Sequence, residues 1–441
     1  MVIARPSRWT LLAAMLSLCL VLPAYGSDKK NPVPDVPLEQ WLHGPDRADF
    51  PVAIKVLRPR LTYQQRYLVE VRAVIDGPVA NKRHLFAWLM VADPFGKWDD
   101  LSMRNDDIVG MTLDPTMEVQ FISAFYATPA TYTAAFAVYD AVSKHLYVRH
   151  FAVAVEPLKN DPMPAFGAGA PRVEFIEQIP SLAQSFDSLG SAPLQKVDAY
   201  WPLADGIMPL GVATARPLQF DVVIDFSDIG DRVKFAGPLP FRKRSQMLYI
   251  ETATAMADAL TGLHPEKGCL RLSAFDADSM EVDMWRQAPD QLDWNAIRKQ
   301  RLKRYTQVSV AGLQGRKDRP AFIRNLLQRL ATPEAGCGSE NPSALHVVIL
   351  VSQGFQFDDG SHKQALDPRE LGEYKLFYFR VEPSHQVESG FGRRSLAVME
   401  PMFDQLTGIL KPIHPRLTNI PSPEKFREAL GKTLAEIAAT K

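Results

Sequence analysis

The sequence predicts a two-domain protein, in which an antiparallel β-sandwich precedes an α/β domain with a mostly parallel central sheet. Two observations lead to this expectation. From Pro51 to Val155, short segments of alternating apolar and polar residues recur at intervals of roughly ten residues, which is typical of a sandwich. From Leu218 onward, apolar strand-like segments alternate with helical ones, a pattern that favours a parallel sheet covered by helices on both faces.

The chain of 441 residues is long enough for several domains. Its composition changes along the sequence, and proline, glycine and alanine gather between Pro157 and Pro171, as in a linker. The predicted organisation is a signal peptide (1–26), an extended arm (27–49), a β-sandwich domain (50–156), a linker with a packed connection (157–215) and an α/β domain (216–441).

The first residues have the pattern of a secretory signal peptide. Arg5 and Arg8 precede the apolar run from Trp9 to Leu22, and Ala24 and Gly26 form a small-x-small cleavage site. We therefore expect an exported protein, periplasmic or extracellular after cleavage, with an uncleaved membrane anchor as the alternative. No later stretch is apolar enough to cross a bilayer, so we expect no transmembrane span in the mature chain.

Charge and cysteine content limit the partners and the compartment. The 50 Lys and Arg residues equal the 50 Asp and Glu residues, so no net charge attracts nucleic acid, and we expect no such partner. Cleavage would remove Cys19 and leave Cys269 and Cys337. In an exported protein two cysteines indicate a disulfide, and two free buried thiols are the alternative.

The strands of the predicted sandwich follow from their alternation. Val69, Val71 and Ala73 are apolar and are separated by polar Glu70 and Arg72, as in a strand with one buried face. The segment that begins at Ala130 resembles a late strand of immunoglobulin-like sandwiches, in which a Tyr hydroxyl ties down a corner. Tyr132 is the residue at that position, and a half-buried strand tyrosine is the alternative.

The predicted α/β domain is organised around the strand Leu218–Ile224, which is apolar on both faces and therefore central. Asp225 and Ser227 follow this strand at the edge where open α/β sheets bind ligands. Further strands are expected at 268–275, 345–351, 374–381 and 417–420. Helices are expected at 247–260, 295–305, 320–330, 395–410 and 423–439, the last with Ser422 as its N-cap.

An apolar strand that ends in Asp-x-Ser, a helix, and a later strand that ends in Ser-x-Gly together resemble the von Willebrand factor type A domain. The similarity covers about Arg216 to Lys441 and is strongest at 220–228 and 345–354. It implies a Rossmann-like fold and a binding function. The same resemblance extends upstream to exported bacterial proteins that join such a domain to a β-sandwich.

The family binds a divalent cation through a metal-ion-dependent adhesion site with oxygen ligands. Asp225 and Ser227 match the first two ligand positions, whereas the third is Ile229 and the later Asp is replaced by Gln353. The loop expected to supply Thr has none. It carries three cations instead, Arg316, Lys317 and Arg319. The resemblance therefore implies a degenerate site in which Mg²⁺ binds weakly or is absent, and we expect no cofactor.

No pattern typical of a catalytic site is present: the sequence lacks a Gly-x-Ser-x-Gly motif, a phosphate loop and a pair of histidines at metal-binding spacing. We expect a non-catalytic module that binds a protein or a cell-envelope component. The alternative is an enzyme, or an accessory subunit of one, that acts at the same sheet edge.

The basic run from Arg298 to Arg304 is either a solvated helix face or a contact surface. The partner-binding candidates are Asp225, Ser227, Gln353, Arg316, Lys317 and Arg319.

Overall fold

The protein is described by a computed structural model in which residues 35–98, 103–109, 118–170, 172–176, 203–227, 239–306, 319–332, 337, 344–354, 367, 369, 374–382 and 405–440 are placed. The predicted signal peptide and the start of the predicted arm lie outside these residues, as does most of the connection between 172 and 211. Among the described residues, no helix has the length and apolar character needed to cross a membrane.

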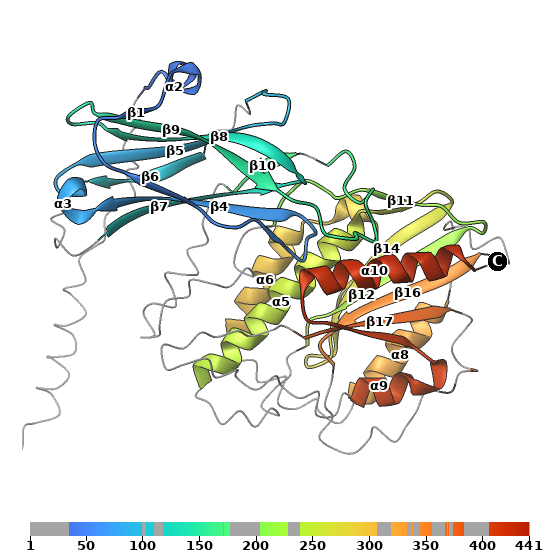
Figure 1. The fold of residues 1–441 in the computed structure, drawn as a ribbon. Coiled ribbons are helices and arrows are strands. Elements are labelled where there is room, and N and C mark those ends of the chain that lie inside the picture. Colours follow the sequence, from blue (N-terminus) through green and yellow to red (C-terminus); the bar gives the residue numbers. More distant parts are fainter. Residues whose placement is uncertain are drawn as a thin grey trace, which may run out of the picture.

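Two five-stranded antiparallel sheets form the N-terminal part (Figure 1). They enclose a common core to which Val69 and Val71 contribute from one sheet and Phe136 and Val138 from the other. The first sheet has the order β1 (Arg47–Ala48), β9 (Leu146–Val155), β8 (Ala130–Asp140), β5 (His84–Ala92) and β6 (Met103–Val109). In the second sheet, β10 (Val173–Phe175), β7 (Glu118–Ala127), β4 (Tyr67–Asp76) and β2 (Ala53–Val56) are neighbours, and β3 (Arg60–Leu61) also pairs with β4.

Tyr132 holds the corner before β8. Its hydroxyl donates a hydrogen bond to the carbonyl oxygen of Thr128 at 2.7 Å, and its side chain is fully buried. The carbonyl oxygen of Arg172, 40 residues further along the chain, lies 3.1 Å from the same hydroxyl. The prediction that this tyrosine ties down a corner is confirmed.

The predicted extended arm is wrong in one part, because Leu38–His43 forms the short helix α2. Trp41 packs its ring against Trp88 of β5, with the ring centroids 5.7 Å apart. The helix covers an apolar patch on the outer face of the first sheet, to which Phe86 and Met90 also belong. Tertiary packing of this kind stabilises a helix that is too short to form alone. The short helix α3 (Gly77–Ala80) follows β4.

The C-terminal part is built on a six-stranded sheet in the order β15-β14-β12-β16-β17-β18. The strand β12 (Leu218–Asp225) pairs in parallel with β14 (Gly268–Asp276) and β16 (Leu345–Ser352), and all eight of its residues are buried. The strands predicted at 218–224 and 345–351 are therefore confirmed, and the structure places them next to each other and parallel. The remaining strands are β17 (Lys375–Val381) and β18 (Arg416–Ile420), both parallel, and β15 (Glu281–Gln287), which is antiparallel.

Helices cover both faces of this sheet (Figure 1). One face packs against α5 (Leu239–Thr261) and α10 (Pro423–Ala438), and the other against α8 (Arg319–Ala331) and α9 (Gln405–Leu410). The helix α6 (Trp294–Thr306) lies along α5. The described chain also contains the 3₁₀ helices η3 (Pro289–Gln291) and η6 (Lys411–Ile413). Ser422 caps α10 as predicted, since its side chain accepts a hydrogen bond from the backbone N–H of Lys425.

The predicted fold class is wrong for the chain as a whole. Strands take up more of the described chain than helices, 41% against 26%, so the protein is mainly β rather than a sandwich joined to a Rossmann-like α/β domain. The two five-stranded sheets are antiparallel. The six-stranded sheet is mixed, because β15 adds an antiparallel edge to it. Hydrophobic patterning identifies single strands, whereas the direction in which an edge strand pairs depends on the turn that precedes it.

The segment from 157 to 212, predicted as a linker and a packed connection, is tied to the C-terminal part where it is described. Arg427 of α10 donates two hydrogen bonds of 2.7 Å to the carboxylate of Asp161. The strand β11 (Leu210–Val212) pairs in parallel with β13 (Leu263–Pro265). Of the two alternatives for the cysteines, the structure contains the disulfide, which joins Cys269 at the start of β14 to Cys337.

Candidate functional site

Asp225 is the last residue of β12, at the carboxyl edge of the six-stranded sheet. Its Oδ1 accepts hydrogen bonds from the backbone N–H of Ser227 at 2.8 Å and from the Ser227 hydroxyl. Its Oδ2 accepts a hydrogen bond of 2.7 Å from the hydroxyl of Ser352, the last residue of the neighbouring strand β16. The parallel pairing of the two strands therefore brings both motifs of the sequence together.

A second set of hydrogen bonds fixes these donors. The Ser227 hydroxyl accepts from the backbone N–H of Ala277 at 2.7 Å, and the Ser352 hydroxyl accepts from that of Gly354 at 3.0 Å. Gln353 donates its side-chain amide to the carbonyl oxygen of Ser227 at 2.9 Å. Three of the predicted site residues, Asp225, Ser227 and Gln353, therefore lie together in one network.

The network encloses the carboxyl group. Asp225 has no exposed surface, and Ser227 is 2% exposed. Burial raises the pKa of Asp225 to about 7, while the hydrogen bonds from Ser227 and Ser352 act in the opposite direction. The Tyr249 hydroxyl of α5 donates to the backbone carbonyl of Asp225, and burial raises the pKa of this phenol as well. A partner from outside has no direct access to the carboxylate.

This arrangement does not fit a divalent cation. A cation needs several oxygen atoms with lone pairs free to face it, whereas both oxygens of Asp225 and both hydroxyls are directed at protein donors. Within the described ranges, no group of three or more His, Cys, Asp or Glu side chains is arranged to hold a metal ion. Ile229, which stands at the third ligand position of the sequence motif, lies outside those ranges.

The predicted cationic contacts are only partly described. Arg316 and Lys317 lie outside the described residues. Arg319 begins α8, is 6% exposed, and forms an ion pair with Asp278 in the turn between β14 and β15. Its charge is therefore partnered inside the protein rather than presented to solvent.

Part of the basic run on α6 also faces inward. Arg301 is 6% exposed and pairs with Asp283 and, at 3.3 Å, with Asp276. Arg298 pairs with Glu251 of α5 at 3.2 Å, whereas Lys299 is exposed. The two alternatives for this run, a solvated face and a contact surface, therefore do not apply to its two inward arginines, which stabilise the packing of α6.

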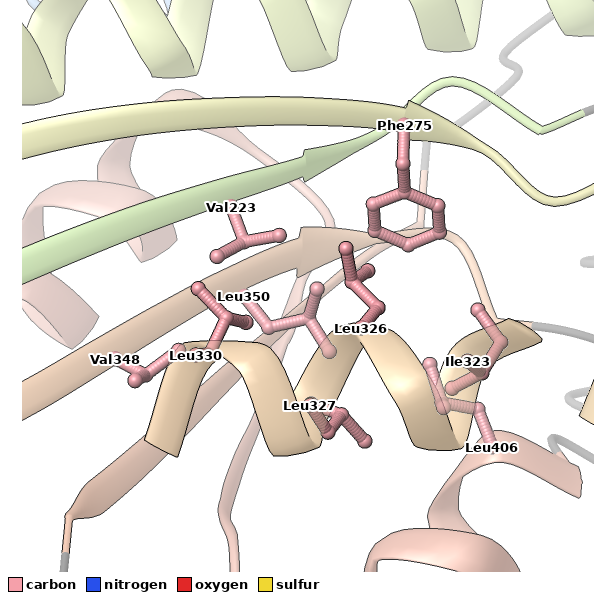
Figure 2. A pocket seen from close by; sticks show the side chains of 9 residues that line it. All are labelled: Val223, Phe275, Ile323, Leu326, Leu327, Leu330, Val348, Leu350 and Leu406. Carbon is pink, nitrogen blue, oxygen red and sulfur yellow. The ribbon is translucent and has the colours of Figure 1, made fainter. Parts of the chain in front are cut away.

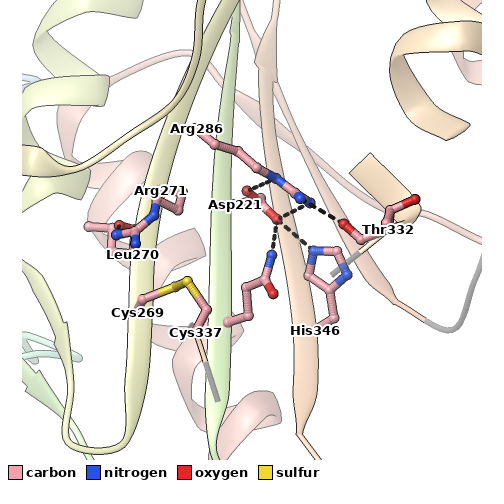
Figure 3. The surroundings of a disulfide bond; sticks show 9 residues. Asp221, Cys269, Leu270, Arg271, Arg286, Thr332, Cys337 and His346 are labelled. Atoms are coloured by element: carbon pink, nitrogen blue, oxygen red, sulfur yellow. Dashed lines mark hydrogen bonds and ion pairs between the residues drawn. A yellow bond between two sulfur atoms is a disulfide. The ribbon is translucent and has the colours of Figure 1, made fainter. Parts of the chain in front are cut away.

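A second polar cluster lies near the other end of the same sheet (Figure 3). Asp221 of β12 accepts hydrogen bonds from Arg286 at 3.0 and 3.1 Å, and its Oδ2 lies 2.6 Å from Nε2 of His346. Gln219 donates to the same carboxylate at 2.8 Å. The sequence contains a signal for this cluster, an aspartate inside an otherwise apolar strand, but Arg286 lies on a different strand and has no motif.

The face of the sheet that α8 covers contains a small void (Figure 2). Only aliphatic and aromatic side chains line it, so it has no polar group that could orient a ligand. We interpret it as a packing defect between α8 and the sheet rather than a binding site. Its lining consists of Val223, Phe275, Ile323, Leu326, Leu327, Leu330, Val348, Leu350 and Leu406.

No protein family and no curated protein sequence matches the chain. Among solved structures, a putative ApaA protein from Bordetella pertussis is 13% identical, with 25% of this chain and 96% of that chain covered and a TM-score of 0.16. A β-glucuronidase from Bacteroides uniformis is 12% identical, with 84% of this chain and 45% of that chain covered and a TM-score of 0.18. Neither similarity indicates a shared fold or activity, and neither protein is named as a von Willebrand factor type A domain.

Proposed function

We propose that the protein is a non-catalytic binding module that acts in the cell envelope without a bound cation. The observation that carries this proposal is the enclosed carboxyl group of Asp225. Its Oδ1 accepts hydrogen bonds from Ser227, and its Oδ2 accepts one from Ser352. The residues that resemble an adhesion site thus stabilise the sheet edge. Binding then depends on residues around this edge rather than on Asp225 itself.

The disulfide supports the exported location in this proposal. Disulfides persist in oxidising compartments such as the periplasm and are rare in the bacterial cytosol. Cys269 and Cys337 are joined although 68 positions separate them in the sequence. A reducing compartment would leave both thiols free and remove this connection.

One observation favours the alternative, an enzyme or an enzyme subunit that acts at this edge. A carboxyl group with a pKa of about 7 has the value expected of a general acid or base at neutral pH. The complete burial of Asp225 argues against this role, because a catalytic group must lie within hydrogen-bond reach of the substrate. We therefore prefer the binding function.

The role of cations is tested by thermal unfolding of the purified protein with Mg²⁺, Mn²⁺ or Ca²⁺ and with a chelator. We expect the same Tm under all four conditions, in the natural protein and in Asp225→Asn. Calorimetric titration with each ion provides the second measurement. Micromolar binding that Asp225→Asn abolishes would contradict the proposed cation-independent module.

The binding function and the location are tested in cells. We expect the tagged protein to fractionate with the periplasm or the medium, with no free thiol detectable by mass spectrometry. Chemical crosslinking in intact cells should yield the same envelope partner with and without chelator. Recovery in the cytoplasm with two free thiols would contradict the exported location, and loss of the partner with chelator would contradict cation independence.

A further inference from the structure

Two acidic side chains of α5 lie at the junction between the N-terminal sheets and the C-terminal part. Glu251 and Asp258 are seven positions apart, about two helical turns, so they lie on the same side of α5. The opposite side of the helix, with Tyr249, Ala253 and Met256, packs on the six-stranded sheet. The acidic side therefore faces the segments that connect to the sandwich.

Asp258 contacts the sandwich through one amide. Gln64, in the turn between β3 and β4, donates its Nε2 to Asp258 and also to the carbonyl oxygen of Ala204 at 2.7 Å. The Gln64 Oε1 accepts the backbone N–H of Ala204 at 2.8 Å. Gln64 is 1% exposed, so this amide is a buried link between three segments of the chain.

Glu251 is 3% exposed and has one cationic partner, Arg298. The ion pair uses Oε2, and Oε1 is buried with no hydrogen-bond partner among the described residues. The buried phenol of Tyr126 in β7 is influenced by the charges of both Glu251 and Arg298. Glu251 therefore lies at the same junction, on the side of the second sheet.

Among the described residues at this junction, acidic groups outnumber basic groups. Besides Glu251 and Asp258, the carboxyl groups of Glu174 and Asp205 lie close enough to Asp258 to disfavour its negative charge. The cations that the described part of the chain places here are Arg66 and Arg298. Each forms an ion pair with a glutamate, Arg66 with Glu174 and Arg298 with Glu251. Ionisation of all four carboxyl groups leaves a net negative charge in a poorly solvated contact.

We propose that this junction is an acid-stabilised contact, which holds the sandwich against α5 at mildly acidic pH and opens as the pH rises above neutrality. The chemistry is the protonation of Asp258, which lets its side chain remain buried without a charge, and of Glu251, which reduces the excess of negative charge at the junction. Opening would expose the turn at Gln64 and the acidic side of α5 to a partner or to solvent.

The direction of the pH dependence follows from linkage. Burial raises the pKa of Asp258 to about 7 and that of Glu251 to about 8. In the open state both groups regain ordinary values, so the closed state binds more protons. The contact is most stable below the ordinary carboxyl pKa values, which are 3.8 for Asp258 and 4.5 for Glu251. It weakens as the pH rises from these values through about 7 for Asp258 and about 8 for Glu251.

The test measures the distance between the two parts at two pH values. Spin labels on Lys55→Cys in β2 and Lys432→Cys in α10, both exposed positions, report the separation by pulsed electron paramagnetic resonance. We expect one narrow distance at pH 5.5 and a second, longer population at pH 8.5, with the ratio of open to closed protein higher by at least about ten-fold. An unchanged distribution would overturn the proposal.

Two variants and a control assign the effect to these groups. Asp258→Asn retains an oxygen that accepts from Gln64, and Glu251→Gln retains one that accepts from Arg298. Each variant should reduce the open population at pH 8.5, and either one alone suffices if the other does not fold. Asp225→Asn removes a buried acid with a raised pKa elsewhere in the sheet and should leave the opening unchanged. Opening equal to that of the natural protein in both variants would refute the assignment.

Discussion

Asp221 and Asp225 lie four positions apart in β12, and their partners give them different electrostatic surroundings. Among the described residues, Asp225 meets hydroxyl and backbone N–H groups rather than a cation. Asp221 meets the guanidinium of Arg286 and the ring of His346. Two buried aspartates of one strand therefore have chemically different partners, neutral donors for Asp225 and an arginine and a histidine for Asp221.

The surroundings of Asp225 predict a specific pH dependence of stability. Because its pKa in the folded protein, about 7, lies above the usual value of 3.8, its contribution is greatest in acid and is lost as the pH rises toward 7. We expect Asp225→Asn to flatten this part of the curve and to be at least as stable as the natural protein at pH 8. Chemical denaturation between pH 4.5 and 8 measures the free energy of unfolding of both proteins.

The matched variant is Asp225→Ala, which removes the acceptor for Ser227 and Ser352. It should lower the free energy of unfolding by about 2 kcal/mol relative to Asp225→Asn at every pH, since neither variant titrates at this position and the buried hydroxyls lose their partner only in Asp225→Ala. A stability curve of Asp225→Asn parallel to that of the natural protein would show that Asp225 stays ionised when folded.

The sequence was sufficient to predict that Asp225, Ser227 and Gln353 meet, because parallel strands end at one edge of a sheet. It was insufficient to predict that their hydrogen bonds close the site, since Ala277 and Gly354 contribute backbone groups that no residue type reveals. The loop with Arg316, Lys317 and Arg319 was predicted to contact a partner. Arg319 instead pairs with Asp278, in a turn about 40 positions earlier in the chain. A basic residue in a sequence does not show which carboxylate it pairs with in the folded protein.

At the scale of elements, α8 is fixed at both ends by arginines. Arg319 pairs with Asp278 at its start. At its end, Arg286 of β15 donates to the carbonyl oxygens of Leu330 and Thr332 at 2.9 and 2.6 Å. Carbonyl groups at a helix C-terminus lack partners within the helix, so Arg286 stabilises α8 as well as Asp221.

Loss of Arg286 should therefore destabilise the C-terminal part strongly. We expect Arg286→Met to lower the free energy of unfolding by about 3 kcal/mol, because it leaves Asp221 buried with only His346 and Gln219 as partners. Urea denaturation at neutral pH measures the change. Arg416→Met, which removes an exposed ion pair with Glu436, is the control and should change stability by less than about 0.5 kcal/mol. Equal effects of the two variants would refute the role of Arg286.

The disulfide links a strand of the six-stranded sheet to Cys337, which follows α8 in the chain (Figure 3). It joins the start of β14 to Cys337, after α8, across 68 positions. In the chain-entropy account, a loop of this length contributes about 4 kcal/mol. We expect the double variant Cys269→Ser, Cys337→Ser to lose roughly 2–4 kcal/mol, measured against the oxidised protein. Reduction of the natural protein should give the same loss, and stability independent of reductant would contradict this expectation.

At the scale of the whole molecule, contacts between distant segments of the described chain hold the sandwich, the connecting segment that contains Asp161, and the C-terminal part together. Gln64 bonds Asp258, Gln65 donates to the carbonyl oxygen of Pro423 at 3.2 Å, and Arg427 bonds Asp161. The last pair is 266 positions apart, and no sequence pattern announces it. Local periodicity predicted many of the elements, and the antiparallel strand β15 follows β14 across a short turn. This junction, by contrast, depends on long-range contacts that a single sequence does not record.

These contacts predict how the molecule unfolds. With the junction intact, we expect one calorimetric transition, because unfolding of either part removes contacts that stabilise the other. Arg427→Met removes two hydrogen bonds to Asp161 and the one to the carbonyl oxygen of Met163. The two parts should then unfold separately at pH 6, with midpoints at least about 5 °C apart, since a loss of about 1 kcal/mol shifts the Tm of a small domain by that amount. Lys432→Met, on the exposed side of the same helix, removes only a surface ion pair and should retain one transition. A single, unshifted transition in Arg427→Met would mean that the two parts are held together without this ion pair.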